Sequence, residues 1–295
     1  MPAAAIDSTV VASAAVAQYS GSYSSCQSVP ARDGDGHDMS FGTGNSEGEG
    51  HGLLTASLLG GFFQTDPTLD WQMSPSEQVM VMYLVEHLRP RAAIEIGTRF
   101  GGSLQVLARH CGRVYSLDID PEVKERLKGR FENVEYLIGR SEETLPPLID
   151  RLQRENAEVG FVLIDGDHST DGVRRDIDNI LRYKPSTTLY IIMHDSFNPV
   201  VRRGLTAANW SGCPYVHRVE LDLVAGGVNT HPNFRGQLWG GLAIAILAPE
   251  PRRGDLEISA GSQLTYLAAS RTFDPGLLRK VVKRIATWTR VPVQS

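Results

Sequence analysis

The sequence predicts an α/β fold, in which a doubly wound and mostly parallel sheet has helices on both faces. Two observations predict it. Short apolar runs alternate with amphipathic segments through the middle of the chain, and a glycine-rich turn follows the first of these runs. Strands that alternate with helices form parallel sheets, because each helix carries the chain back to the edge where the next strand begins. A sheet of this kind binds its ligands beyond the carboxyl ends of its strands.

Composition and charge exclude several classes of protein. The 295 residues contain 41% hydrophobic and 21% charged side chains, as in an ordinary globular chain, and carry a formal net charge of −5. A negative net charge is unfavourable for nucleic-acid binding, which depends on the neutralisation of phosphates. No apolar run reaches the roughly 18 residues of a membrane helix. We therefore expect neither a nucleic acid nor a membrane as a partner.

The cysteines and the N-terminus indicate the compartment. The three cysteines lie far apart and are odd in number, which is not typical of a disulfide scaffold or a structural zinc site. The apolar stretch 10–17 has no Lys or Arg before it, whereas a secretory signal begins with such residues. We therefore expect a cytoplasmic protein.

The chain divides into four segments of different composition. Residues 1–52 are rich in Ala and Ser and then in Gly, which predicts a flexible arm; a lid that orders over a bound substrate is the alternative. Residues 53–75 form a linker or lid segment, and residues 76–250 form the ligand-binding domain. Residues 251–295 are a C-terminal extension, in which the stretch 275–288 has the apolar stripe of an amphipathic helix docked on the core.

The first element of the domain is a helix that begins at Ser74. A capping hydroxyl there, followed by Pro75 and by Glu77 in the first turn, is typical of a helix start, and Pro90 ends the pattern. The five strongest apolar runs, which we expect to be buried strands, are 92–96, 114–117, 134–137, 159–164 and 189–193. The helices between them are expected near 102–110, 121–131, 142–154 and 170–183. Weaker strand patterns occur at 241–247, 256–258 and 264–267.

The glycine-rich turn has the sequence EIGTRFGGS, from Glu95 to Ser103. Its glycines let the backbone turn sharply, and the helix that follows presents free amides to a carboxylate or phosphate. Asp118 lies at the tip of the second strand, where a carboxylate accepts hydrogen bonds from both ribose hydroxyls of a nucleoside. Asp120 is better explained as a helix N-cap. A tight turn without a ligand remains the alternative for the glycines.

Two classes of cofactor suit such a turn. A dinucleotide site has the spacing G-x-G-x-x-G, whereas this turn has G-x-x-x-G-G, with Glu95 two residues before Gly97. The Glu95 carboxylate would repel a diphosphate but could face a cation. S-adenosylmethionine carries a sulfonium and an ammonium group, and Ser103 could meet its carboxylate. The turn therefore favours S-adenosylmethionine, with a nicotinamide oxidoreductase as the alternative.

Acidic and histidine residues follow the fourth and fifth strands. Asp165 and His168 come after the run 159–164, and His194 and Asp195 come after the next strand. Because parallel strands end at the same edge of a sheet, Asp165, His194 and Asp195 can converge on one divalent cation. His168 can then reach the same site as a base. Burial of several ionisable groups without compensation is costly, so the cluster indicates a functional site.

These motifs together resemble the class I S-adenosylmethionine-dependent methyltransferases. Within that class the chain is most similar to metal-dependent O-methyltransferases of the catechol O-methyltransferase kind, and to the antibiotic-tailoring group that includes cephalosporin hydroxylase-like proteins and macrolide-sugar O-methyltransferases. The resemblance covers residues 76–250, which it makes the catalytic domain. The motifs that carry it are Glu95 to Ser103, Asp118-Ile119-Asp120-Pro121, Gly139-Arg140-Ser141-Glu142, Asp165-x-x-His168 and His194-Asp195.

The resemblance implies a role for each motif. The glycine turn binds the methionine part of S-adenosylmethionine, the tip of the second strand binds the ribose, and the third motif flanks the adenine. The cofactor-binding residues implied are Glu95, Gly97, Thr98, Gly101, Ser103, Asp118, Ile119, Ser141, Glu142 and Asp165. Asp165 and Asp195 also hold the metal, and His168 occupies the place of the catalytic base beside Asp165.

His194 departs from the family's pattern, because the tailoring enzymes tend to carry a carboxylate there. Mg²⁺ prefers oxygen ligands, whereas an imidazole suits Mn²⁺, Fe²⁺ or Zn²⁺ better. Either the metal differs, or His194 lies behind Asp165 and Asp195, which then bind the metal with water. Mg²⁺ is the metal that the resemblance implies first, with Mn²⁺ and Fe²⁺ as alternatives.

The function that the resemblance implies is metal-assisted methylation of a hydroxyl on a small molecule. A sugar of a secondary metabolite, such as an antibiotic, is the first expectation, and a catechol-like vicinal diol is the second. Relatives are often dimers or larger assemblies, which implies a homo-oligomer. Several residues after the fifth strand either pack or form walls for the acceptor, namely Tyr215, His217, His231, Asn233, Phe234 and Trp239.

Two other functions stay open. A methyltransferase that acts on nitrogen or carbon would keep the cofactor site with a degenerate metal site, and the metal dependence of turnover separates it. An accessory protein would keep the crevice, bind a tailoring enzyme and methylate no small acceptor.

Overall fold

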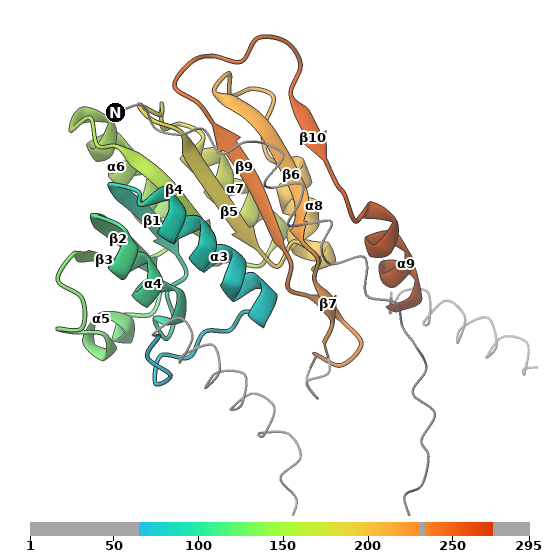
Figure 1. The fold of residues 1–295 in the computed structure, drawn as a ribbon, viewed down its shortest axis with the longest axis horizontal. Coiled ribbons are helices and arrows are strands. Elements are labelled where there is room, and N and C mark those ends of the chain that lie inside the picture. Colours follow the sequence, from blue (N-terminus) through green and yellow to red (C-terminus); the bar gives the residue numbers. More distant parts are fainter. Residues whose placement is uncertain (1–64, 230–233, 274–295) are drawn as a thin grey trace, which may run out of the picture. The chain divides into compact units, whose positions relative to one another are not determined.

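The centre of the fold is an eight-stranded sheet (Figure 1). The computed structural model describes residues 65–229 and 234–273. The expected arm 1–52, most of the segment 53–75 and the expected helix 275–288 lie outside the described residues. Within these described ranges, no helix has the length and the apolar character that a membrane span requires.

The five strongest predicted strands are confirmed, and neighbouring pairs among them are parallel. They are β1 (Ala92–Ile96), β2 (Arg113–Asp118), β3 (Val134–Ile138), β4 (Val159–Ile164) and β5 (Leu189–His194). Every residue of β1 and β4 is buried, including Glu95, the one charged residue in these two strands. Their other residues are apolar on both faces, since a strand covered on both faces needs no alternation. The sheet grows from β1 in both directions, to β2 and β3 on one side and to β4 and β5 on the other. Ligands of such sheets bind at this switch point.

The second half of the sheet follows β5. Its strands are β6 (Val216–Val224), β9 (Leu242–Leu247) and β10 (Glu257–Ser259), and the full order is β10-β6-β9-β5-β4-β1-β2-β3. β9 runs antiparallel to both of its neighbours, β5 and β6. A separate two-stranded sheet consists of β7 (Gly227–Val228) and β8 (Leu238–Trp239). These observations confirm the predicted α/β fold, a doubly wound and mostly parallel sheet, with the antiparallel strand β9 inserted between β5 and β6.

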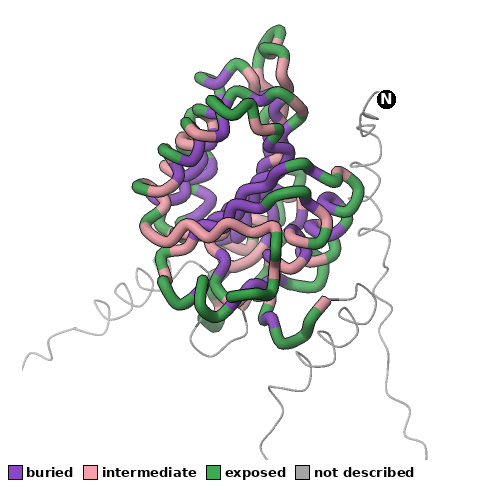
Figure 2. Tube along the Cα trace, turned by 90° about the vertical axis from the view of Figure 1, so that its left-hand side faces the viewer, coloured by how far each residue is buried: buried purple, intermediate pink, exposed green. Residues whose placement is uncertain are grey.

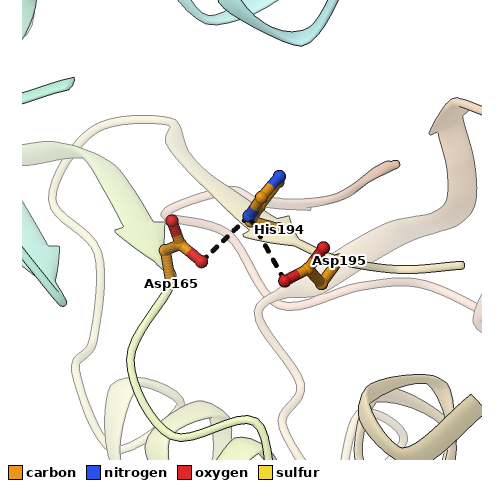
Figure 3. A group of neighbouring side chains, drawn as sticks. All are labelled: Asp165, His194 and Asp195. Atoms are coloured by element: carbon orange, nitrogen blue, oxygen red, sulfur yellow. Dashed lines mark hydrogen bonds and ion pairs between the residues drawn. The ribbon is translucent and has the colours of Figure 1, made fainter. Parts of the chain in front are cut away.

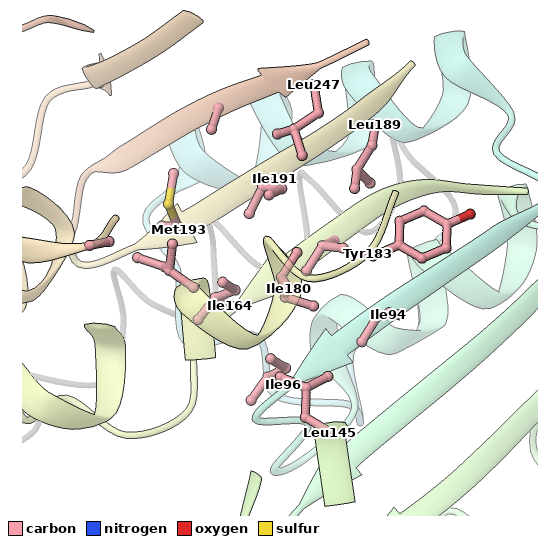
Figure 4. Close-up of a cluster of buried hydrophobic side chains, with 14 of the residues drawn as sticks. Ile94, Ile96, Leu145, Ile164, Ile180, Tyr183, Leu189, Ile191, Met193 and Leu247 are labelled. Carbon is pink, nitrogen blue, oxygen red and sulfur yellow. The ribbon is translucent and has the colours of Figure 1, made fainter. Parts of the chain in front are cut away.

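Helices cover both faces of the sheet, as predicted. On one face pack α3 (Pro75–Leu88), α4 (Gly102–His110) and α5 (Glu122–Arg126). On the other face pack α6 (Ser141–Arg154), α7 (Thr170–Ile180) and α8 (Pro199–Ala207). Figure 4 shows part of the second core, where Leu145 of α6 and Ile180 of α7 approach isoleucines of β1, β4 and β5. In Figure 2 the buried stretches, in purple, gather toward the interior of the described chain.

Some predicted elements differ from the structure, and some observed elements were not predicted. The stretch 264–267 was expected as a strand and instead lies in helix α9 (Gln263–Phe273), because so short an apolar run does not distinguish the two periodicities. The helix expected at 121–131 is the shorter α5. Neither β6 nor α8 was predicted. Both left signals, since Val219, Leu221 and Leu223 alternate with polar residues, and α8 has an Asn cap followed by Pro.

Candidate functional site

A pocket of about 1370 Å³ lies at the carboxyl edge of the sheet. Its walls come from the ends of β1, β2, β4 and β5, from the first turn of α3 and from the loop around β7 and β8. A ligand pocket for one small molecule typically measures about 300–1,000 Å³. The pocket is therefore large enough for a nucleoside cofactor together with a second small molecule.

Position 97, at the tip of β1, requires a glycine because the chain just after β4 approaches it closely. Its φ is +91°, and a Cβ at this position would lie 2.1 Å from the backbone oxygen of Asp165. The Gly97 amide donates to the Leu117 carbonyl at 2.8 Å, and the Asp165 amide donates to the Ile96 carbonyl at 2.8 Å. The glycine thus lets the tips of β1, β2 and β4 meet at the floor of the pocket. Gly101 (φ +84°) provides the second turn, at the start of α4.

Glu95 lies beneath this turn and is fully buried. The hydroxyls of Thr98 and Ser103 donate to its carboxylate at 2.7 and 2.6 Å. Burial raises the pKa of Glu95 to about 7 despite these hydrogen bonds. In this structure Thr98 and Ser103 both contact Glu95, and none of the three lines the pocket. They stabilise the turn, and direct contact with a cofactor stays a prediction.

Asp118 does line the pocket, and it fixes the turn to the tip of β2. Its Oδ2 accepts from the amides of Thr98 and Arg99 at 2.9 and 2.7 Å, and its Oδ1 accepts from the Asp120 amide at 2.8 Å. A carboxylate has about four acceptor positions. One position therefore stays open for a ribose hydroxyl, and a second hydroxyl would have to replace or share an amide. Ile119 beside it is exposed at the pocket wall, as a residue that covers a ligand would be.

The residues expected around an adenine lie together on the wall next to Asp118. Ser141 and Glu142 both line the pocket. The Ser141 hydroxyl donates to the buried Asp176 at 2.6 Å, and Glu142 forms ion pairs with Arg140 and Arg175 at 2.9 and 3.0 Å. Both side chains thus line the pocket, each held by a partner of its own, and contact with an adenine stays a prediction.

Asp165, His194 and Asp195 converge at the ends of β4 and β5. One ligand atom of each lies within 4.8 Å of the others. Figure 3 shows a carboxylate oxygen of each aspartate directed at the same ring nitrogen, and His194 Nδ1 lies 2.9 Å from Asp165 Oδ1 and 3.6 Å from Asp195 Oδ2. The structure thus brings these three side chains together, and the binding of a cation by them stays a prediction.

His168 completes the cluster from the loop after β4. Its Nε2 lies 2.7 Å from Asp195 Oδ2 and 3.6 Å from Asp165 Oδ1. Contacts with Asp165 and then Asp195 raise the pKa of His168 to about 10. Burial alone would lower the pKa of His194, but Asp165, Glu77 and Asp195 outweigh it and raise that pKa well above the ordinary value. Burial would likewise raise the pKa of Asp165, but His194 and His168 lower it to about 2.

The cluster has the donors of a divalent-cation site. Two carboxylates and one imidazole, with ligand atoms this close together, match the oxygen and nitrogen donors that Mn²⁺ and Fe²⁺ accept. Without a cation, the aspartates are compensated by the two imidazoles instead. Asp165, His194 and Asp195 thus fit a dication, and His168 is held beside them.

Glu77 is a fourth acidic residue at this site, and sequence reasoning assigned it only to the start of a helix. It is 1% exposed, and its Oε2 lies 3.5 Å from His194 Nε2. The Gly241 amide donates to Glu77 Oε1, and the Gly240 amide donates to Asp195 Oδ1 at 2.6 Å. The sequence does not indicate that α3 lies next to the end of β5. The one feature that could have pointed to a close contact there is the adjacent pair Gly240 and Gly241.

Two of the residues proposed as acceptor walls do line the pocket. The Trp239 ring lies 5.7 Å from the His168 ring and 5.5 Å from the Phe234 ring. Tyr215 and His217 do not, because the start of β6 pairs with the end of β9 at the opposite edge of the sheet. There His217 Nε2 contacts the Glu250 carbonyl at 2.9 Å. His231 and Asn233, the remaining two, lie outside the described residues.

Part of the chain is similar in sequence to known proteins. Residues 94–196 match a family model described as a methyltransferase domain. Rhamnosyl O-methyltransferases of Mycobacterium bovis and Mycobacterium tuberculosis are 30% identical over 120 residues, which cover 38% of this chain and 49% of theirs. The chain therefore spans about half the length of the curated relatives that it matches.

Among solved structures, the O-methyltransferase from Bacillus cereus in complex with SAH is 18% identical, with a TM-score of 0.44 over 66% of this chain and 90% of that one. The O-methyltransferase TomG from Streptomyces achromogenes, involved in tomaymycin synthesis, is 20% identical, with a TM-score of 0.47 over 66% of this chain and 89% of that one. The strand order is that of a Rossmann-like methyltransferase fold, and residues 94–196 are similar in sequence to a methyltransferase domain.

Proposed function

We propose that this protein transfers a methyl group from S-adenosylmethionine to a hydroxyl of a small molecule, with a divalent cation held by Asp165, His194 and Asp195. The observation that carries the proposal is the convergence of these side chains and His168 on the wall of a pocket that Gly97 and Asp118 also line. The match of residues 94–196 to a methyltransferase domain supports the reaction class.

The cofactor half of the pocket has the features that a nucleoside needs. Asp118 offers a carboxylate oxygen at the switch point of the sheet, and Ile119 offers an apolar surface beside it. Ser141 and Glu142 stand on the same wall as hydrogen-bonding groups. The cofactor, when bound, supplies an electrophilic methyl group on a sulfonium.

His168 is the residue placed to accept the proton of the acceptor's hydroxyl. Its imidazole is 40% exposed at the pocket wall, and its Nε2 is 2.7 Å from Asp195. Asp195 holds the ring in place, and without a cation the two aspartates keep the imidazole protonated. A dication on Asp165 and Asp195 would compensate these carboxylates in its stead and lower the pKa of His168, so that Nε2 could accept the proton of the substrate. A positioned base of this kind contributes roughly 10²–10⁴-fold to a rate. A dication, when bound at the neighbouring triad, lowers the pKa of a hydroxyl bound to it.

The donor set favours Mn²⁺ or Fe²⁺ over Mg²⁺ if His194 is a ligand. Mg²⁺ demands oxygen donors, whereas an imidazole is accepted by the first-row transition metals. His194 Nδ1 is directed at both aspartates. We therefore propose that Mn²⁺ supports activity at least as well as Mg²⁺.

The acceptor that we propose is a sugar hydroxyl on a larger small molecule. Trp239 and Phe234 form an aromatic wall next to His168, and such rings stack on the apolar face of a sugar or on a planar ring. The rhamnosyl specificity named for the matched mycobacterial relatives supports the sugar over a catechol-like diol.

The test is methyl transfer by the full chain, with S-adenosylmethionine and a panel of rhamnosides, other glycosides and catechols, followed as release of S-adenosylhomocysteine. We expect turnover on a hydroxyl acceptor that disappears after chelation and returns with Mn²⁺ or Mg²⁺. Asp165→Asn should abolish it, whereas Asp171→Asn, which changes an exposed carboxylate of α7, should not.

Three results would contradict parts of the proposal. Undiminished turnover by metal-stripped protein would refute the cation, and methylation at nitrogen or carbon would refute the acceptor class. Failure of S-adenosylhomocysteine to raise the melting temperature would refute the cofactor, because a ligand of the native state stabilises it by mass action.

A further inference from the structure

We propose that Glu77, in the first turn of α3, is a positioning residue that orients His194 toward the cation. This inference rests on the proposed function, because it concerns the same site. Glu77 lies outside the matched segment 94–196, so the match assigns it no role. The geometry around its carboxylate is what points to one.

The Glu77 carboxylate is buried among groups that fix its position. Its Oε2 accepts from the Ser74 amide at 2.5 Å, and its Oε1 accepts from the Gly241 amide. A buried carboxylate is costly unless its oxygens are satisfied. A helix cap alone would not need the side chain to reach across to β9, so the contact with Gly241 directs the carboxylate to the pocket rather than to solvent.

The two ring nitrogens of His194 have different surroundings among the described residues, and Glu77 faces the one that forms no hydrogen bond. Its Nδ1 faces Asp165 at 2.9 Å, while its Nε2 is buried without a hydrogen-bond partner among the described residues. An imidazole that binds an ion through one nitrogen carries a proton on the other, and a carboxylate that accepts this proton fixes the ring. Glu77 Oε2, 3.5 Å from Nε2, is the carboxylate in that place.

The loop before β9 connects this pair to the rest of the site. Gly240 and Gly241 have φ of +73° and +86°, and a Cβ on Gly240 would lie 2.7 Å from Glu77 Oε1. Successive amides of this loop hold Asp195 and Glu77. This turn therefore fixes Asp195, a proposed metal ligand, and also Glu77, the carboxylate next to the proposed ligand His194.

The pairing of Glu77 with His194 makes a prediction about the residue at position 194. A carboxylate at position 194 would face the buried charge of Glu77, and like charges that share a site repel. His194 and Glu77 thus form a matched pair. The loss of metal affinity that follows removal of the Glu77 charge should therefore disappear or reverse when His194 is replaced by aspartate.

The experiment measures Mn²⁺ binding to the full-length protein, with Mn²⁺ alone as the probe, by electron paramagnetic resonance and calorimetry. Substitutions behind a metal-binding histidine typically cost about 10–100-fold in metal affinity, and we expect this loss for Glu77→Gln. Glu86→Gln is the matched control, since it removes an equal charge from the exposed side of the same helix. In the His194→Asp background, Glu77→Gln should leave Mn²⁺ affinity unchanged or raise it.

An equal loss in both backgrounds would overturn the inference, because a merely structural role of Glu77 does not depend on residue 194. Unchanged affinity of folded Glu77→Gln would overturn it as well. If Glu77→Gln does not fold, the melting temperatures of His194→Asp and of the double variant His194→Asp/Glu77→Gln decide instead. We expect the double variant to have the higher melting temperature. A lower melting temperature of the double variant would contradict the pairing. Wild-type protein that binds no Mn²⁺ would refute the proposed cation site itself, a result distinct from equal binding by wild type and Glu77→Gln.

Discussion

His168 carries the most specific chemical role proposed for a single side chain. It contacts Asp195 and Asp165 without being one of the three converging ligand groups. His168→Ala should therefore lower kcat by roughly 10²–10⁴-fold through loss of the base. Its Mn²⁺ affinity should stay the same or increase, because a positive side chain beside two carboxylates is removed. Parallel loss of Mn²⁺ affinity would show that His168 is a ligand instead.

Asp176 allows a prediction about pH and stability. It is 1% exposed, and burial raises its pKa to about 6 from 3.8 despite the hydrogen bond from Ser141. Between these two values the unfolded chain has lost the proton while the folded protein keeps it, so stability falls as pH rises through this window.

Asp176→Asn keeps the acceptor for Ser141 but removes the buried charge. The variant should therefore be more stable than wild type at pH 8, by about 1–3 kcal/mol, with a smaller difference at pH 4. Urea unfolding at both pH values measures this. A stability difference that does not change with pH would contradict the assigned cause.

For single residues, the sequence predicted which side chains come together at the edge of the sheet, but not the residues that hold these side chains in position. Asp165, His194, Asp195 and His168 follow successive strands, and parallel strands bring such residues to one edge. Glu77 could not be found in the same way, because a helix outside the strand pattern supplies it. Nor does sequence reveal that Glu95 is fully buried under the glycine turn rather than exposed to the pocket.

The glycine turn is the element on which the geometry of the pocket depends most. Gly97→Ala would combine a left-handed backbone with a Cβ 2.1 Å from the Asp165 carbonyl oxygen. Gly129 has a similar φ, +73°, but nothing within 4 Å of an added Cβ, so Gly129→Ala isolates the backbone cost of about 1–2 kcal/mol.

We expect Gly97→Ala to lose clearly more stability than Gly129→Ala in urea unfolding, and to lose S-adenosylhomocysteine binding in calorimetry, which Gly129→Ala keeps. Equal destabilisation by the two substitutions, with cofactor binding intact, would show that the strand tips do not require the glycine.

Elements were predictable where local pattern and tertiary environment agree. β1 and β4 are buried on both faces, so their composition alone marks them as strands. β6 has partly exposed positions along its length, which dilutes the apolar signal, and the two-residue strands β7 and β8 are too short to have a period. The stretch 264–267 was wrongly predicted as a strand, because it is a short apolar run that belongs to a helix.

At the scale of the whole molecule, the topology explains why residues distant in sequence share one pocket. The ends of β1, β2, β4 and β5 meet at one edge, and the antiparallel β9 begins at that same edge next to the end of β5. The loop that leads into β9 therefore brings Trp239 to His168 and Gly240 to Asp195. The sequence predicted the parallel half of this arrangement. The antiparallel half depends on pairings that only the folded sheet specifies.

The most direct measurement is anomalous diffraction from crystals of the protein grown with S-adenosylhomocysteine and Mn²⁺. The proposed function predicts a manganese peak within coordination distance of Asp165, Asp195 and His194 Nδ1, in the same pocket as the nucleoside beside Asp118. A nucleoside in the pocket without manganese at these three side chains would contradict the central claim.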